Sequence, residues 1–113
     1  MRKFSGGGYL TIKLLEIMKR EITFGDHTAI IDMGEGRAML TVLESSLPVQ
    51  LADALDAAGD MDATEVSLIP GGACIRIVHD LSTADLLAVV CEIISDVYDT
   101  DTTISYARAE DSI

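Results

Sequence analysis

The chain has 113 residues, of which 49% are hydrophobic, so it is long enough and apolar enough for one domain with a single core. This apolar content excludes a disordered acidic tail, which lacks the surface to offset its ordering entropy. The formal net charge is −11, a field that repels nucleic acid and anionic lipid and favours basic partners. We therefore expect no direct nucleic-acid binding and no membrane association.

The charge is unevenly distributed along the chain. Residues 1–20 hold five lysines and arginines and one acid, a net charge of +4. Residues 21–113 hold three arginines and eighteen acids, a net charge of −15. The acidic body can act as a recognition surface for a basic partner, or it can serve solubility alone.

The two cysteines, Cys74 and Cys91, lack the C-x-x-C spacing of a redox or zinc site and do not form a disulfide framework. They indicate a reducing compartment. Near the C-terminus, Glu92, Ser95 and Asp96 interrupt the longest apolar stretch, so no transmembrane span is predicted. We expect a cytoplasmic protein.

The chain begins with residues 1–9, which contain three consecutive glycines and are expected to form a flexible arm. Residues 10–22 are predicted to form a helix, because apolar residues recur at helical spacing and polar residues fill the other side. Gly25 follows as a helix stop. The apolar stripe of this helix consists of Leu10, Leu14, Ile17, Met18 and Ile22.

Two β-hairpins are predicted from β-branched runs that flank short glycine-containing loops. The first joins residues 28–33 to 38–43, and the second joins residues 65–69 to 73–79. Pro70-Gly71 fits the central positions of a type II turn in the second hairpin.

A helix is predicted between the hairpins, opening at Ser45-Ser46 with a serine cap and ending near Gly59. Its outer stripe is acidic and continues into the following loop. This stripe is either a solvated helix face or a surface for a basic partner.

The last helix, residues 82–98, is the clearest element. Ser82 is a good N-cap, and Asp85 three residues later completes a capping-box arrangement. The helix is apolar nearly all round, apart from one stripe of Asp85, Glu92, Asp96 and Asp99. Two explanations stay open: a central helix covered by the sheet and the first helix, or a homodimer interface. The predicted interface consists of Leu86, Val89, Val90, Ile93 and Val97.

These elements run α-β-β-α-β-β-α. The order predicts an α+β fold with an antiparallel sheet of about four strands and helices packed mainly on one face. Residues 10–99 form the predicted domain. The polar tail, residues 100–113, could add an edge strand at residues 102–106.

Catalytic and cofactor-binding patterns are absent from the sequence. His79-Asp80 is a histidine–acid pair, but Cys74 lies five residues before His79 and hence on the opposite face of the same strand. The histidines and cysteines are too scattered for a metal site, and the glycine runs lack the lysine and spacing of a phosphate loop. The sequence therefore predicts a non-enzymatic protein with no catalytic residues, metal or cofactor.

The predicted function is a protein–protein interaction module, a homodimer that binds a protein partner as an adaptor or chaperone. In its element order over residues 10–98 and in its acidity, the chain resembles the small acidic secretion chaperones and related α+β folds. The alternative is an acidic inhibitor that mimics nucleic acid, as anti-defence, immunity or antitoxin proteins do. The predicted partner-binding residues are Asp53, Asp56, Asp60, Asp62, Glu92, Asp96 and Asp99.

Overall fold

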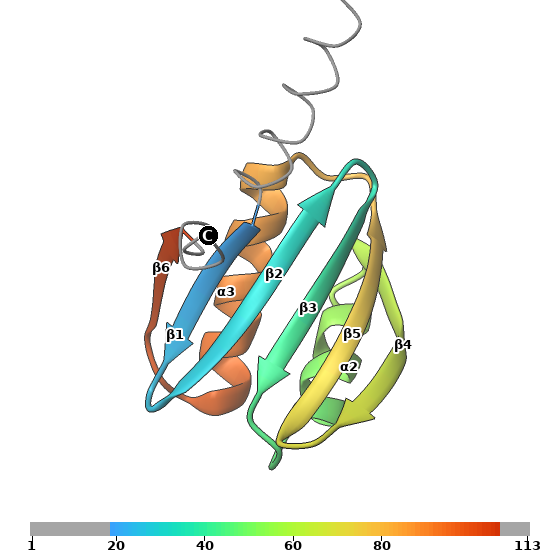
Figure 1. The fold of residues 1–113 in the computed structure, drawn as a ribbon. Helices are drawn as coiled ribbons and strands as arrows, with labels where there is room; N and C mark the ends of the chain where they lie inside the picture. Colours follow the sequence, from blue (N-terminus) through green and yellow to red (C-terminus); the bar gives the residue numbers. More distant parts are fainter. Residues whose placement is uncertain (1–18, 107–113) are drawn as a thin grey trace, which may run out of the picture.

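The computed structural model describes residues 19–106, which form one antiparallel sheet and two helices (Figure 1). The sheet order is β4-β5-β3-β2-β1-β6. The predicted α+β class and antiparallel pairing are confirmed, but the sheet has six strands instead of about four. In chain order the elements are β1 (Lys19–Phe24), β2 (His27–Gly34), β3 (Arg37–Leu43), α2 (Pro48–Ala57), β4 (Met61–Ile69), β5 (Gly72–His79), α3 (Thr83–Tyr98) and β6 (Thr102–Tyr106).

The helix predicted over residues 10–22 is wrong at its C-terminal end, where residues 19–22 belong to strand β1. Ile22 and Phe24 are buried and alternate with exposed Thr23, which is the two-residue period of a strand. The expected helix stop is the turn between β1 and β2, where Gly25 has a φ of 62°. The rest of the predicted helix, residues 10–18, lies outside the described residues. Strand β1 is hydrogen-bonded to β2 on one side and to β6 on the other.

The edge strand expected at residues 102–106 is confirmed as β6 (Thr102–Tyr106), which pairs antiparallel with β1. The C-cap residue of α3, Asp99, has a left-handed φ of 54° and turns the chain back toward the sheet. Thr102 then lies beside Cys91 of α3. Burial raises the pKa of the Cys91 thiol, and the hydrogen bond with Thr102 lowers it by less. Cys91 is therefore a core residue.

Helices α2 and α3 lie on the same side of the sheet (Figure 1). The core is formed between them and the sheet face that they cover. We call the opposite face, which no other element of residues 19–106 covers, the outer sheet face. Among the described residues, no helix has the length and apolarity needed to cross a membrane.

The sheet and α2 cover most of the apolar surface of α3. Leu86 and Val90 are fully buried in the core, so these two predicted interface residues are not available to a second copy. Val89, Ile93 and Val97 are partly buried and pack against the core. The large exposed hydrophobic residues lie elsewhere, at Leu43, Val49, Leu68, Val78 and Ile104.

The start of α3 is as predicted, because the Ser82 hydroxyl accepts a hydrogen bond of 3.1 Å from the Asp85 N–H. The start of α2 is different, since its N-cap is Leu47 and no serine side chain caps it. The carboxylate of Glu44 instead accepts hydrogen bonds from Ser46 and, at 3.1 Å, from the Leu47 N–H. A residue three positions before the N-cap thus binds the free N–H groups that precede the helix.

The second hairpin turns at Pro70-Gly71, where Gly71 has the positive φ of 81° that a type II turn requires. Gly72 starts β5 in close contact with β3. A Cβ atom at this position would lie 1.8 Å from the Val42 carbonyl oxygen, so glycine is needed to bring the two strands together.

Candidate functional site: an acidic end of the molecule

The connection from α2 to β4 places several carboxylates close together. Asp56 lies in the last turn of α2, and its Oδ1 atom accepts a hydrogen bond of 3.2 Å from the Ala63 N–H of β4. Gly59 has a φ of 85°, which allows the chain to reverse between the two elements. Asp60 and Asp62 follow directly after this reversal.

The end of β5 lies opposite this connection, because Met61 pairs with His79 and Asp62 pairs with Val78. Between the two segments is a hollow of about 350 Å³. Its lining consists of Asp56, Gly59, Asp60, Met61, Asp62, Val78, His79 and Asp80.

A second hollow, of about 390 Å³, adjoins the first and shares His79 and Asp80 with it. It extends to Glu35 in the β2–β3 turn and to the start of α3. The backbone of His79 fixes this arrangement by donating a 3.0 Å hydrogen bond to the Gly36 carbonyl. We call the five acids that line the two hollows the acidic end: Glu35, Asp56, Asp60, Asp62 and Asp80.

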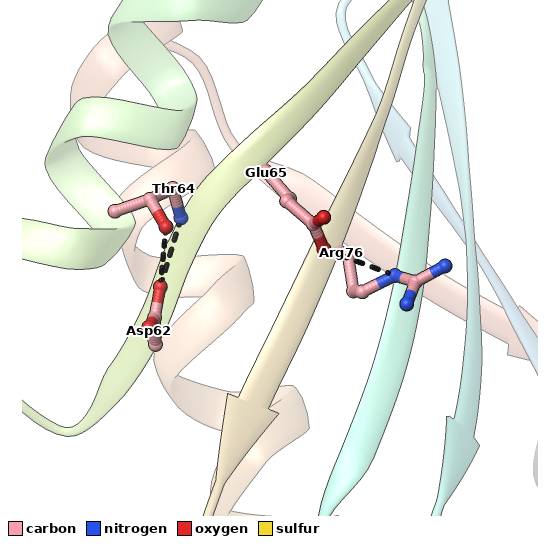
Figure 2. Close-up of polar contacts among 4 residues, drawn as sticks. All are labelled: Asp62, Thr64, Glu65 and Arg76. Atoms are coloured by element: carbon pink, nitrogen blue, oxygen red, sulfur yellow. Dashed lines mark hydrogen bonds and ion pairs between the residues drawn. The ribbon is translucent and has the colours of Figure 1, made fainter.

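The acidic end has a strongly negative field, because it gathers five carboxylates and no lysine or arginine within residues 19–106 lines either hollow. Hydrogen bonds from the Thr64 hydroxyl (2.8 Å) and N–H (3.1 Å) lower the pKa of Asp62 and favour its charged form (Figure 2). The C-terminus of α2, with its negative dipole end and no basic residue in the last turn, adds to this field.

The arrangement does not form a metal centre. Within residues 19–106, no three histidine, cysteine, aspartate or glutamate side chains lie close enough to hold a metal ion. The carboxylates are spread along the hollows, a geometry suited to several separate cationic groups such as lysine and arginine side chains.

His79 is largely enclosed, with 6% of its surface exposed. Its Nδ1 atom accepts a hydrogen bond of 3.0 Å from the Leu81 N–H. This bond assigns the proton of the neutral ring to Nε2, which has no hydrogen-bond partner among the described residues. Cys74 lies on the outer sheet face, so β5 holds the two side chains on opposite faces, as the sequence predicts.

The structure brings together three of the predicted partner-binding residues, Asp56, Asp60 and Asp62. Asp53 is exposed one turn earlier on α2 and lines neither hollow. The others, Glu92, Asp96 and Asp99, are exposed along α3 and also lie outside the hollows.

Sequence reasoning missed Glu35 and Asp80 as members of this site. Both lie at strand ends, Glu35 in a glycine turn and Asp80 directly after His79. Their position beside a hairpin turn or a strand end was visible in the sequence, but their proximity to Asp60 depends on the pairing of β3, β4 and β5. Comparison of the chain with protein-family models, curated proteins and solved structures finds no match.

Proposed function

We propose that this protein is a non-enzymatic interaction module, an adaptor or chaperone-like protein that binds a basic segment of a protein partner at the acidic end. The observation that carries the proposal is the convergence of five carboxylates from separate segments on two adjoining hollows, which no lysine or arginine of residues 19–106 lines. Such a surface attracts lysine and arginine side chains and increases the rate of encounter with a basic partner.

The chemistry of the hollows supports binding. Apart from carboxylates, the ionisable side chain that the described part of the chain adds to their lining is His79, which is enclosed and whose Nδ1 accepts a backbone hydrogen bond. The hollows therefore offer a partner negative charge and hydrogen-bond acceptors. Each close ion pair in such a surface contributes about 0.2–1 kcal/mol where water reaches it, so several must act together.

The test is binding of a fluorescent peptide of ten alternating lysine and serine residues, followed by anisotropy at low and at physiological salt. We expect binding that weakens with salt, and about a tenfold loss of affinity in the double variant Asp60→Asn/Asp80→Asn. The matched control is Glu92→Gln/Asp96→Asn, which changes the net charge equally on the exposed face of α3. Its affinity should fall by about twofold or less.

Two results would contradict the proposal. If the peptide fails to bind at low salt, the acidic end is not a recognition surface for basic segments. If the two double variants lose affinity equally, the attraction comes from net charge alone and the hollows have no special part in it.

The second candidate function is inhibition of a nucleic-acid-binding protein by mimicry of phosphates. It is favoured by a second row of exposed carboxylates, at Asp85, Glu92, Asp96 and Asp99, along the solvent side of α3. A mimic would use both rows, so it should inhibit a basic nuclease at low salt in competition with DNA. If the Glu92→Gln/Asp96→Asn variant weakens inhibition as much as Asp60→Asn/Asp80→Asn does, mimicry is favoured over a local peptide site.

A homodimer is also part of the proposal. With Leu86 and Val90 buried, the predicted interface on α3 is reduced to the partly buried Val89, Ile93 and Val97. Another surface of the molecule is better suited to self-association.

A further inference from the structure

No element of residues 19–106 covers the outer sheet face, yet several apolar side chains lie on it, where a solvated sheet face is usually polar. Ile30 and Met39 are partly buried at its centre, whereas Leu43 and Val78 are 44% and 51% exposed. Hollows of about 230 and 290 Å³ lie on this face, and Met39 and Arg76 line both. The outer sheet face is therefore concave in two places, and part of it is hydrophobic.

The charge of this face differs from that of the rest of the molecule. Cross-strand register places Lys19 and Arg76 on it, with Arg37 at the start of β3. Four acids share the face with these three basic residues, so its net charge is only −1: Glu21, Asp32, Asp62 and Glu65. The other acids of residues 19–106 lie elsewhere, mainly beside the helices and turns. Self-association through the helix side would bring many like charges together, whereas the outer sheet face can meet its own copy with little net repulsion.

One row of residues crosses the sheet with alternating charges. When the row is turned end to end and laid over itself, each charge meets a charge of opposite sign. The row crosses five strands from β1 to β4, and neighbours in it are register partners. Its signs are positive, negative, neutral, positive and negative. In order, the residues are Lys19, Asp32, Met39, Arg76 and Glu65.

A two-fold axis parallel to β3 would place this row over its own reverse. Met39 would then lie over Met39 of the other copy, Asp32 over Arg76, and Lys19 over Glu65. The same axis superposes Thr41 and Leu43 on their own copies, since both lie on β3 on this face. Arg37 also meets its own copy, but it is exposed at the start of the strand, where its side chain can remain in water.

The charged side chains of this row are accessible to a second copy. Arg76 and Glu65 form an ion pair of 3.4 Å between Nε and Oε1, and their side chains are 58% and 74% exposed (Figure 2). Such an exposed pair contributes little to the fold, about 0–1 kcal/mol. It leaves most of the guanidinium free to bind a second carboxylate.

The area of the face is close to the lower limit for a specific dimer. Five strands spaced about 4.8 Å apart, with about seven residues each at about 3.4 Å, give a footprint of roughly 570 Å² per copy. Specific interfaces start near 600 Å² per partner. We therefore expect a dissociation constant of about 1–100 μM, because area of this size without large anchors gives moderate affinity.

We propose that the outer sheet face is the homodimer interface, with two sheets packed face to face about a two-fold axis along β3. The occupant of the face is a second copy of this chain. This inference rests on the homodimer part of the proposed function. It is separate from the acidic end, because only one of the five carboxylates there, Asp62, lies on the outer sheet face.

The test uses the full chain and measures its mass by sedimentation equilibrium from 1 to 500 μM. We expect a monomer–dimer equilibrium in the wild type. In Arg76→Glu, Asp32 of each copy would lie over a glutamate, and two such contacts should weaken dimerisation about 100-fold. Asp32→Lys should have the same effect, because it places a lysine over Arg76.

Mixing the two variants is the decisive step. Arg76→Glu and Asp32→Lys have complementary rows, so an equimolar mixture should form a heterodimer with about the affinity of the wild type. The control Asp96→Lys carries the same charge change as Asp32→Lys on the solvent side of α3 and should leave dimerisation unchanged. Circular dichroism should give each variant the wild-type spectrum, since all three side chains are exposed.

Three outcomes would overturn the inference: a wild-type chain that is monomeric at 500 μM, dimerisation that survives both single variants, or a mixture that fails to associate although each variant is folded. The first also removes the homodimer from the proposed function, whereas peptide binding at the acidic end tests the rest of that function separately. If dimerisation survives both variants but is lost in Val89→Asp, the dimer interface lies on α3 and not on the outer sheet face.

Discussion

Replacing Glu44 with glutamine tests the hydrogen bonds that precede α2. Glu44 is 7% exposed and accepts hydrogen bonds from the N–H groups of Ser46 and Leu47 and from the Ser46 hydroxyl. Burial raises the pKa of this carboxyl, but the hydrogen bonds, chiefly that of the Ser46 hydroxyl, outweigh burial and lower the pKa from 4.5 to about 2. The folded state therefore binds the charged form preferentially.

The pKa sets an upper limit on the effect of this substitution. A fall from 4.5 to about 2 corresponds to about 3 kcal/mol of stability at neutral pH. The flanking residues, Leu43 and Ser45, are exposed, so water screens part of this interaction. The loss of a helix cap costs about 0.5–2 kcal/mol. We expect Glu44→Gln to lower the free energy of unfolding by about 1–2 kcal/mol at pH 7.

The pH dependence separates charge from packing. Because the pKa is lower in the folded state, the stabilisation is fully present above pH 4.5 and is lost as the pH falls toward 2. Urea unfolding at pH 7, 5, 4 and 3 should show the difference between wild type and Glu44→Gln shrinking with each step below pH 5. Asp53→Asn, an exposed carboxylate on α2, serves as the control. A difference that stays constant from pH 7 to pH 3 would refute the reasoning.

Three further substitutions test the fold. Leu86→Asp should unfold the chain, because it buries an unpaired charge in the core at a cost of more than about 4 kcal/mol. A native circular dichroism spectrum in this variant would disprove the placement of α3. Gly72→Ala should lower the free energy of unfolding by about 2 kcal/mol or more, because its Cβ would overlap the Val42 carbonyl, and an unchanged urea midpoint would show that β3 and β5 are further apart. Ser82→Ala should lower the free energy of unfolding by about 1 kcal/mol, because the Asp85 N–H loses its hydrogen-bond acceptor. Ser82→Thr keeps the hydroxyl and should keep the wild-type thermal midpoint; equal losses in both variants would contradict the cap.

Local sequence patterns predicted most of the elements. Both hairpins, the helix that begins after Ser82 and the edge strand at residues 102–106 are present. Each depends on interactions between residues close in the chain, such as a turn at Pro70-Gly71 or a cap at Ser82. These signals need no knowledge of the remaining structure.

The prediction failed at β1, where two periodicities compete. Ile22 continues the apolar helical stripe of Leu14 and Met18. It also begins the alternating apolar–polar–apolar pattern of Ile22-Thr23-Phe24, which is typical of a strand. The strand is the more stable of the two, because β2 and β6 provide hydrogen-bond partners for the backbone N–H and C=O groups on both sides of β1. Neither partner could be assigned to this segment from its own residues.

The candidate site was predictable in part. Asp56, Asp60 and Asp62 are close in sequence, so their grouping follows from the helix end and the loop after it. Glu35 and Asp80 join them because β5 lies between β3 and β4 in the sheet, an order that differs from the order along the chain.

The sequence by itself determined the acidity of this protein, the apolar character of residues 86–98 and the local turns and caps, because these depend on composition and on neighbours within a few positions. Only the tertiary structure decided what covers the last helix. A six-stranded sheet and α2 bury Leu86 and Val90, and an apolar residue can be satisfied equally well by its own chain or by another. The same sheet pairing placed the balanced row of charges on the outer face, since that row exists only when five strands lie in this order and register.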